Sequence, residues 1–399
     1  MTSPTVTGRP NFITLKIFNF VIYGAMAIFN TFFPLYLKHI GVSTIAVGFL
    51  LAGGPMISVL ANPIWGYYSD RMQNIKRTLV MMLIANLIIA QIVFQLHSYL
   101  WIYVVMVGFY FFQTPIFSQS NSLILNVIEG TTVKFGAIRL WASIGYSVTA
   151  LLIGPLLQAV GIDSLGLVFS TSILLTLAFT ISLPRGESRG DFSNADYKQI
   201  FHNKHFVWFV LLGILISVPN SMNATFNGIF IMSMGGSENL VGWSIFIASV
   251  LEVPVFLLLD RFLKRTKGAM VIVLIFNCLL YSLRWLLMSL AQSPVDVILI
   301  QGLHGLTYGT YFYVGTQLTS MMVPREYRAS GQAAFALTWG GLSGFFAGIF
   351  GGIIFEKLGA SQMYMTGVLL TLLGAVGFYL LWISLRRDSA KEIKASTTH

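Results

Sequence analysis

A dozen long apolar runs, separated by short polar segments, divide this 399-residue chain. A helix needs about 20 consecutive apolar residues to cross a bilayer, and each run is long enough to do so. Only 10% of the residues are charged and 56% are hydrophobic, which excludes an ordinary soluble domain. We therefore predict an all-α membrane protein with twelve transmembrane helices. The predicted spans are roughly 12–38, 43–68, 77–96, 99–127, 137–160, 164–184, 206–233, 240–260, 268–292, 295–322, 329–355 and 361–385.

The net charge of +10 could indicate nucleic-acid binding, but the positions of the basic residues argue against it. Of the 24 Lys and Arg, 21 fall at the N-terminus, in the loops that follow even-numbered spans, and at the C-terminus. Lys38 and Lys357 lie on the opposite side, and Arg284 lies within a span. Short basic loops remain cytoplasmic. We therefore expect cytoplasmic N- and C-termini, a location in the bacterial inner (plasma) membrane, and no nucleic-acid partner.

The longest polar stretch between spans, residues 185–205, divides the chain into two halves. Six predicted spans precede it, within residues 1–184, and six follow it, within residues 206–399. An Asp-Arg pair with basic residues after it occurs at corresponding places in both halves, near the ends of the second and eighth spans. These residues are Asp70, Arg71, Lys76 and Arg77 in the first half, and Asp260 and Arg261 in the second. The repeat predicts two parallel six-helix bundles joined by a cytoplasmic linker.

Residues 66–77, "GYYSDRMQNIKR", resemble the loop motif of the major facilitator superfamily, which has a glycine and an aspartate followed by basic residues. The match falls on Gly66, Asp70, Arg71, Lys76 and Arg77. The resemblance implies the fold of that superfamily, in which a substrate cavity lies between the two bundles near the midplane. An aspartate paired with an arginine of a neighbouring helix could hold the cytoplasmic face closed. We interpret the motif as a gate, together with Asp260 and Arg261; ordinary positive-inside charge is the alternative.

Three ionisable residues, Glu252, Arg284 and His304, lie in the middle of consecutive predicted spans. A charge at the centre of a bilayer-spanning helix costs about 2.5–3.5 kcal/mol on insertion scales, so such residues usually have a function. A carboxylate, a permanent cation and an imidazole on adjacent helices can bind, move and release a proton. We expect the ionised Glu252 to pair with Arg284 and to release it on protonation. His304 could relay the proton, or could donate to Glu252 or to the substrate. A static buried ion pair is the alternative.

The same positions carry a closer resemblance, to lactose permease and its relatives, the phenylpropionate and nucleoside permeases. The matching segments "KFGAIRLWASIGY", "SVLEVPVF", "SLRW" and "IQGLHG" contain Arg139, Glu252, Arg284 and His304. The resemblance implies that Arg139 contacts substrate and that the other three serve substrate binding and proton coupling. Two acids of the lactose permease pattern are replaced here, by Asn121 and Thr307. This departure argues against lactose as the substrate and leaves Glu252 as the candidate proton carrier.

Polar and aromatic side chains recur at helical spacing on predicted spans of both halves. Positions i, i+3, i+4 and i+7 share a helix face. Such faces could line one cavity or could hold neighbouring helices together. Aromatic members would suit a sugar, a nucleoside or an aromatic acid. The candidate substrate-binding residues are Tyr23, Asn121, Arg139, Tyr146, Asn223, Asn227, Tyr308 and Trp339.

Four glycines, at positions 340, 344, 348 and 352, repeat every four residues in the eleventh predicted span. Small residues at this spacing allow two helix backbones to approach closely. We expect this contact within the bundle rather than at a homodimer interface, and we expect a monomer.

These patterns predict a secondary active transporter, a proton-coupled symporter of a small organic solute that works by alternating access. Its expected partners are that solute, protons and the lipid bilayer. The sequence contains no P-loop, catalytic triad or metal-ligand cluster, so we expect no enzymatic activity, no cofactor and no metal. Two alternatives remain open: a proton-driven exporter of drugs or metabolites, and a non-transporting membrane sensor.

Overall fold

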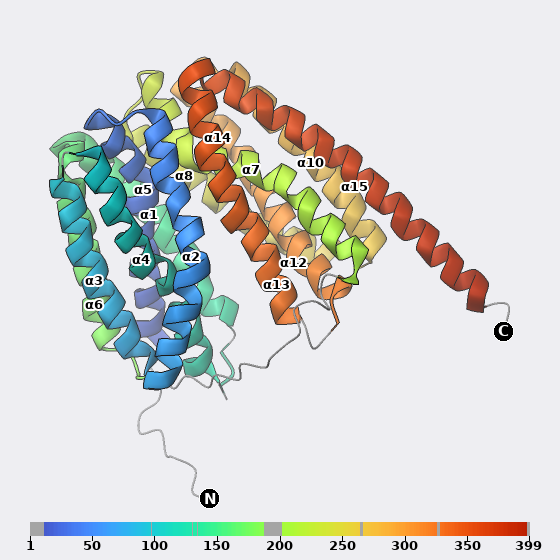
Figure 1. The fold of residues 1–399 in the computed structure, drawn as a ribbon, viewed down its shortest axis with the longest axis horizontal. Helices are drawn as coiled ribbons and strands as arrows, with labels where there is room; N and C mark the ends of the chain where they lie inside the picture. Colours follow the sequence, from blue (N-terminus) through green and yellow to red (C-terminus); the bar gives the residue numbers. More distant parts are fainter. Residues whose placement is uncertain are drawn as a thin grey trace, which may run out of the picture. The chain divides into compact units, whose positions relative to one another are not determined.

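The computed structural model describes residues 12–96, 98–129, 131–133, 135–186, 202–263, 266–324 and 328–396. The regular elements in these ranges are helices (Figure 1). Among the residues just listed, eleven helical segments are long and apolar enough to cross a membrane. The remaining predicted span, 295–322, is present as a helical run from Pro294 to Met322 that an internal π-helix divides. The prediction of an all-α chain with twelve spans is therefore confirmed.

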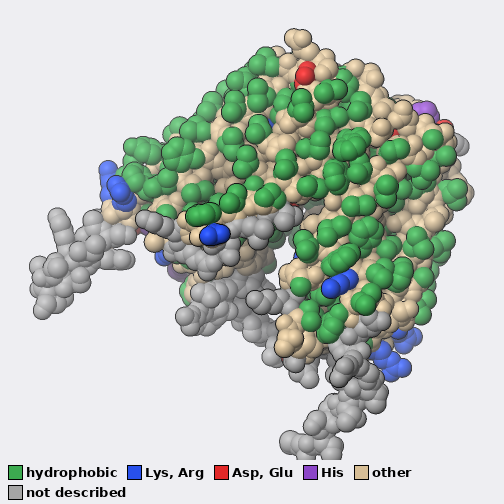
Figure 2. Space-filling model, turned by 180° about the vertical axis from the view of Figure 1, so that it is seen from behind, with side chains coloured by type: hydrophobic (Ala, Val, Ile, Leu, Met, Phe, Trp, Pro, Cys, Tyr) green, Lys and Arg blue, Asp and Glu red, His purple; other side chains and the backbone are tan. Residues whose placement is uncertain are grey.

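Apolar side chains cover the outside of the molecule as well as its core. Figure 2 shows that hydrophobic side chains occupy much of the visible face. Leu60, Leu167 and Phe276, for example, are exposed along the spans. So large an exposed apolar surface is unfavourable in water but favourable in lipid. The helices also satisfy their own backbone hydrogen bonds, as a span in lipid must. The chain is a multi-pass membrane protein.

The chain forms two compact units, and the first comprises residues up to 36 and residues 57–191. It contains α1 (Phe12–His39) without its last three residues, the second part of α2 (Thr44–Met72), α3 (Ile75–Gln95), α4 (Tyr99–Ile128), α5 (Phe135–Val160), η1 (Ile162–Ser164) and α6 (Leu165–Ile181). Helix α3 packs against both α4 and α6 (Figure 1). Helix α5 crosses α1 closely, because a Cβ on Gly145 would overlap the backbone of Phe20.

The second unit comprises residues 37–56 and residues from 192 onward. After the start of α2 it contains α7 (Lys204–Ser233), α8 (Glu238–Val250), α9 (Glu252–Phe262), α10 (Lys267–Leu290), α11 (Pro294–His304), η3 (Gly305–Gly309), α12 (Thr310–Met322), α13 (Arg328–Ala336), η5 (Leu337–Leu342), α14 (Ser343–Leu358) and α15 (Ala360–Ser396). Helix α15 packs along α10 and α7, and α7 also packs against α14 (Figure 1).

The eighth predicted span is broken between α8 and α9. Proline at position 254 accounts for the break, because it has no N–H to donate to the carbonyl of Val250 and its ring clashes with that carbonyl. The break places Glu252 at the first residue of α9. The π-helix η3 lies directly against it, since a Cβ on Gly305 would lie 2.8 Å from the backbone nitrogen of Glu252. Two irregular helix segments therefore meet at the acid.

The last helix is longer than predicted, because α15 continues to Ser396 rather than ending near residue 385. The added segment contains alanine, lysine and glutamate, which are good helix formers. Its first turn is also held to α7. The carboxylate of Asp388 lies 3.3 Å from Nζ of Lys204 and 3.4 Å from Nε2 of His205.

The glycine stripe lies on the eleventh span and packs against the first part of α2. A Cβ on Gly348 would lie 2.5 Å from the carbonyl oxygen of Gly48, and one on Gly352 would lie 3.0 Å from that of Thr44. These backbones can approach only because the side chains are absent. The close backbone approach is present for Gly348 and Gly352, but its partner is α2, a span of the first predicted half, rather than a helix of the same predicted bundle. A Cβ on Gly340 would meet nothing within 4 Å.

We predict that Gly348→Ala lowers the melting temperature of the purified protein, because the added Cβ pushes α14 away from α2. Overpacking of this kind costs about 1–3 kcal/mol. Gly340→Ala is the matched control. It should be neutral or stabilising, because alanine favours a helix over glycine by about 1 kcal/mol. Thermal unfolding in detergent measures both variants. Equal changes in melting temperature would contradict the close contact between α2 and α14.

Candidate functional site

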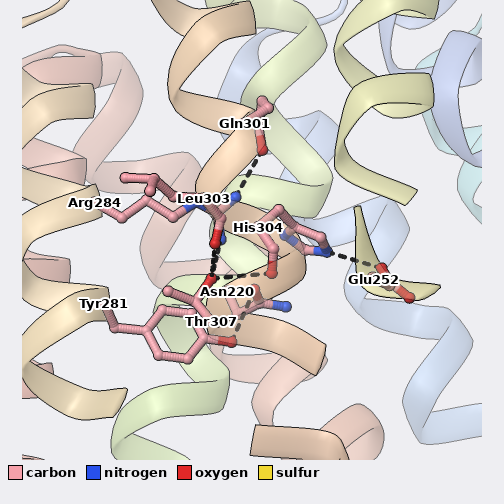
Figure 3. A network of polar contacts seen from close by, with 8 residues as sticks. All are labelled: Asn220, Glu252, Tyr281, Arg284, Gln301, Leu303, His304 and Thr307. Carbon is pink, nitrogen blue, oxygen red and sulfur yellow. Dashed lines mark hydrogen bonds and ion pairs between the residues drawn. The ribbon is translucent and has the colours of Figure 1, made fainter. Parts of the chain in front are cut away.

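The cation Arg284 on α10 lies at the centre of a buried polar network in the second unit (Figure 3). Its side chain has 0% exposure. Nη2 donates a hydrogen bond to Oε1 of Gln301 at 2.6 Å, and Nη1 donates to Oγ1 of Thr307 at 3.2 Å. The guanidinium carbon also lies 4.5 Å from the ring centre of Trp285. A buried charge without partners costs several kcal/mol, so these neutral groups stabilise the cation.

Gln301 connects Arg284 to the asparagines of α7. Its Nε2 donates to Oδ1 of Asn227 at 2.9 Å and to Oδ1 of Asn223 at 3.2 Å. Asn227 donates in turn from Nδ2 to Oγ of Ser244 on α8, at 2.7 Å. Both asparagines, predicted to bind substrate, are buried here. In this conformation their amides join helices α7, α8 and α11.

The carboxylate Glu252 faces His304 across the break between α8 and α9. Nε2 of His304 lies 3.4 Å from Oε1 of Glu252, and the two side chains are 17% and 20% exposed. The pair is therefore partly accessible, whereas Arg284 beside it is not. Figure 3 shows His304 between Arg284 and Glu252. A proton can pass between a carboxylate and an imidazole once they approach to about 2.6–3.2 Å.

The three ionisable residues predicted from the sequence thus come together, but in an order that differs from the expected one. We expected a direct pair between Glu252 and Arg284. The structure instead places Glu252 against His304, and both hydrogen bonds of the guanidinium go to neutral oxygens. Gln301 and Thr307 lie three residues before and after His304, on the same side of the helix. Their oxygens accept the hydrogen bonds of Arg284, so the guanidinium does not contact Glu252.

An aromatic wall, formed by His304, Tyr308, Phe312 and Trp339, continues from this pair. The ring of His304 stacks on that of Tyr308 with centroids 5.0 Å apart and planes 11° apart. Tyr308 stacks in turn on Phe312, and Trp339 of η5 lies 5.2 Å from Tyr308. The spacing of four residues along α11, η3 and α12 explains the row. None of these four side chains is fully buried, so the wall can contact a ligand.

The first unit gathers its own group of candidate residues. The guanidinium carbon of Arg139 lies 4.2 Å from the ring centre of Tyr23, which is a cation–π contact. Phe117 meets Tyr23 edge-on, with ring centroids 5.1 Å apart. Oδ1 of Asn121 is buried and has no hydrogen-bond partner among the described residues. Tyr146 is half-buried on α5.

The first part of the predicted gating motif lies at the end of α2. This helix continues to Met72, four residues beyond the predicted span, so Asp70 lies in its last turn. A Cβ on Gly66 would meet nothing within 4 Å, so close packing does not require this glycine. Arg261 lies in the last turn of α9. The side chain of Asp260 lies outside the described part of the structure.

Lys76 of the same motif caps a neighbouring helix. Its Nζ donates to the carbonyl oxygens of Ile181 and Leu183, at 2.5 and 2.9 Å, where α6 ends. A cation at a helix C-terminus satisfies free carbonyls and interacts favourably with the helix dipole. Arg71 and Arg77 are exposed.

The sequence analysis did not single out several members of the network. Tyr364 on α15 donates to Oδ1 of Asn223 at 3.2 Å, and Asn277 on α10 donates to the backbone carbonyl of Thr307 at 3.1 Å. Asn277 lies seven residues before Arg284, on the same helix face, and this spacing was an available signal. Tyr364 had no such signal. Among the described residues, no group of three His, Cys, Asp or Glu side chains could hold a metal ion.

Known proteins are similar to this chain over most of its length. The chain is 25% identical to the maltose permease of Geobacillus stearothermophilus, over 95% of this chain and 96% of that protein. It is 22% identical to a probable 3-phenylpropionic acid transporter of Escherichia coli K12, over 71% of this chain and 76% of that one. The solved structure of the nucleoside transporter NupG superposes with a TM-score of 0.78, at 17% identity, over 94% of this chain and 98% of that chain.

The fold and the family agree. The structural likeness supports the major facilitator fold that the helix count and the sequence repeat predict. The model of the MFS_1 like family matches residues 12–366, which is most of the chain. Its relatives are membrane transporters of small molecules rather than enzymes. The chain belongs to the MFS_1 like family and is a transporter of the major facilitator superfamily.

Proposed function

We propose that this transporter is a proton-coupled symporter that moves a sugar, a nucleoside or an aromatic acid by alternating access. The observation that carries the proposal is the contact between Glu252 and His304, at 3.4 Å, beside the fully buried Arg284. Intramembrane ionisable groups are expensive, and a partly accessible carboxylate–imidazole pair has little structural value. Its properties suit proton binding and release.

The proposed proton carrier is Glu252, with the imidazole of His304, 3.4 Å away, as its partner. When Glu252 is ionised, its charge acts on Arg284 electrostatically, without direct contact. Protonation removes that charge and leaves the cation stabilised only by neutral groups. Because Arg284 is tied through Gln301 to α7, the change in charge reaches the helices that the network joins. In this way protonation of Glu252 would change the conformation of the transporter.

The break between α8 and α9 offers a place for that change. Leu251 connects the two helices without continuing either, and η3 packs on it through Gly305. A span divided in this way can change the angle between its halves at low cost, because no regular backbone ladder has to be disrupted there. Protonation of Glu252, the first residue of α9, can therefore bias the bend directly.

For the substrate we propose contacts from both units. In the second unit the aromatic wall offers Tyr308 and Trp339 to a sugar or aromatic ring. In the first unit Arg139, with Tyr23 beside it, offers a cation to a hydroxyl or a carboxylate. The polar groups of Asn121 and Tyr146 would add hydrogen bonds. The names of the relatives, which mention maltose, 3-phenylpropionic acid and nucleosides, support these three solute classes.

Further parts of the proposal follow from the charge distribution. We place the protein in the bacterial inner membrane, with both termini in the cytoplasm, because basic residues concentrate on that side. We further propose a monomer, because the glycine stripe packs within the protein. We also propose that Asp70, Arg71 and Arg77, with Asp260 and Arg261, form the cytoplasmic gate. Lys76 contributes to it by holding the end of α6.

We predict that Glu252→Gln abolishes proton-driven accumulation while it preserves exchange of solute across the membrane. The amide keeps the size and polarity of the side chain but cannot bind or release a proton. Proteoliposomes with an imposed pH gradient measure accumulation, and counterflow without a gradient measures exchange. Glu238→Gln, which changes another acid at the start of α8, is the control and should accumulate normally. Accumulation by Glu252→Gln at the level of the wild type would refute the assignment.

We also predict that Thr307→Val destabilises the folded protein by about 1.5–3 kcal/mol, the range for hydrogen bonds to charged groups. The substitution preserves shape but removes the hydroxyl that accepts from Arg284. The matched control is Thr316→Val, because Oγ1 of Thr316 makes the same bond to its own helix, at 2.8 Å to Phe312, away from any buried charge. Thermal unfolding of both variants in detergent is the measurement. Similar losses of stability would show that Thr307 has no special role in stabilising the cation.

A further inference from the structure

A groove of about 210 Å³ lies in the second unit between the start of α7 and the last part of α15. It belongs neither to the polar network around Arg284 nor to the aromatic wall. Its lining includes Lys204, His205 and Trp208 from α7, and Gly377 and Leu380 from α15. Figure 1 shows these two helices side by side.

The groove is apolar at one end and polar at the other. At the apolar end Leu212 lies against Gly377, where a Cβ would meet the leucine side chain. At the polar end Nε2 of His205 lies 3.1 Å from Oγ of Ser384. Residues 377 and 384 are seven positions apart, so the helical rise gives the groove a length of about 10 Å. Trp208 of α7 is exposed and lies between Lys204 at the polar end of the groove and Leu212 at the apolar end.

Positive charge concentrates at the polar end. Lys204 is 68% exposed, and Arg386 and Arg387 are exposed on the adjoining turn of α15. Lys267, at the start of α10, is close enough to act electrostatically on His205. The single acid described among them is Asp388, 3.3 Å from Lys204. The cations outnumber it, and an ammonium has three donors, so capacity for an anion remains.

We propose that this groove binds an anionic phospholipid. The acyl chain lies along Trp208, Leu212 and Leu380, and the phosphate is bound by Lys204 with help from Arg387. A hydrocarbon tail with a charged head matches a groove that changes from apolar to basic along its length. Basic pockets between transmembrane helices on the cytoplasmic side bind anionic headgroups in this way. Trp208, with an apolar ring and a polar N–H, suits the boundary between the two.

The test is quenching of Trp208 fluorescence by brominated lipids in nanodiscs of phosphatidylcholine that hold the full-length protein. We compare brominated phosphatidylglycerol with brominated phosphatidylcholine at equal mole fraction. Trp208→Phe measures the signal of the other tryptophans, which is subtracted. The wild type should show stronger quenching of Trp208 by phosphatidylglycerol. Equal quenching by the two lipids would overturn the proposal, because it would describe ordinary contact with bulk lipid.

Three variants test the headgroup contact. Lys204→Gln should reduce the preference about five-fold, the factor for about 1 kcal/mol per basic residue near an anionic surface. Asp388→Asn should increase it, because the competing carboxylate is gone. Lys357→Gln, an exposed lysine at the far end of α14, is the control and should leave it unchanged. An undiminished preference in Lys204→Gln, or a similar decrease in Lys357→Gln, would contradict the proposed site.

Discussion

The buried guanidinium of Arg284 is the group on which the arrangement of the second unit depends. A permanent charge with no exposure can remain in the membrane only if fixed dipoles replace the water it has lost. Gln301 and Thr307 supply them, and Gln301 must itself be held by Asn223 and Asn227 to present its carbonyl oxygen. One charge therefore determines the packing of α7, α10 and α11. The same two asparagines also bond to Ser244 of α8 and Tyr364 of α15.

Charge placement and helix irregularity work together at Glu252. The proline two residues later breaks the span, and Gly305 allows the π-helix to approach the break. A continuous helix would hold Glu252 in a regular turn, whereas here the acid begins a new helix opposite His304. Glu252 is partly exposed and Arg284 is not, so a proton can reach the carboxylate while the guanidinium stays dehydrated. This difference in access is what the symport hypothesis requires.

The sequence was sufficient to predict the spans, since twenty apolar residues in a row have few alternatives. It also identified Glu252, Arg284 and His304, because charges inside apolar runs are conspicuous. It did not predict which of them would touch. The partner of Arg284 depends on small differences in helix rotation. The sequence marked Thr307 only as the replacement of an acid and did not show that its hydroxyl accepts from Arg284. The π-helices and the contact of Tyr364 with Asn223 likewise arise from tertiary packing. The roles of Arg139, Asn121 and the gating residues remain proposals.

The central claim is that solute binding and protonation are linked, and a ligand-dependent thermal shift tests it most directly. Purified protein is screened with sugars, nucleosides and aromatic acids at about pH 5.5 and about pH 7.5, with Arg139→Ala in parallel, since a ligand of the folded state raises its apparent stability. Symport predicts that one class of solute raises the melting temperature, that the rise differs between the two pH values, and that Arg139→Ala loses it. Stabilisation by none of these solutes, together with stabilisation by diverse cationic amphiphiles, would contradict symport and indicate a drug exporter.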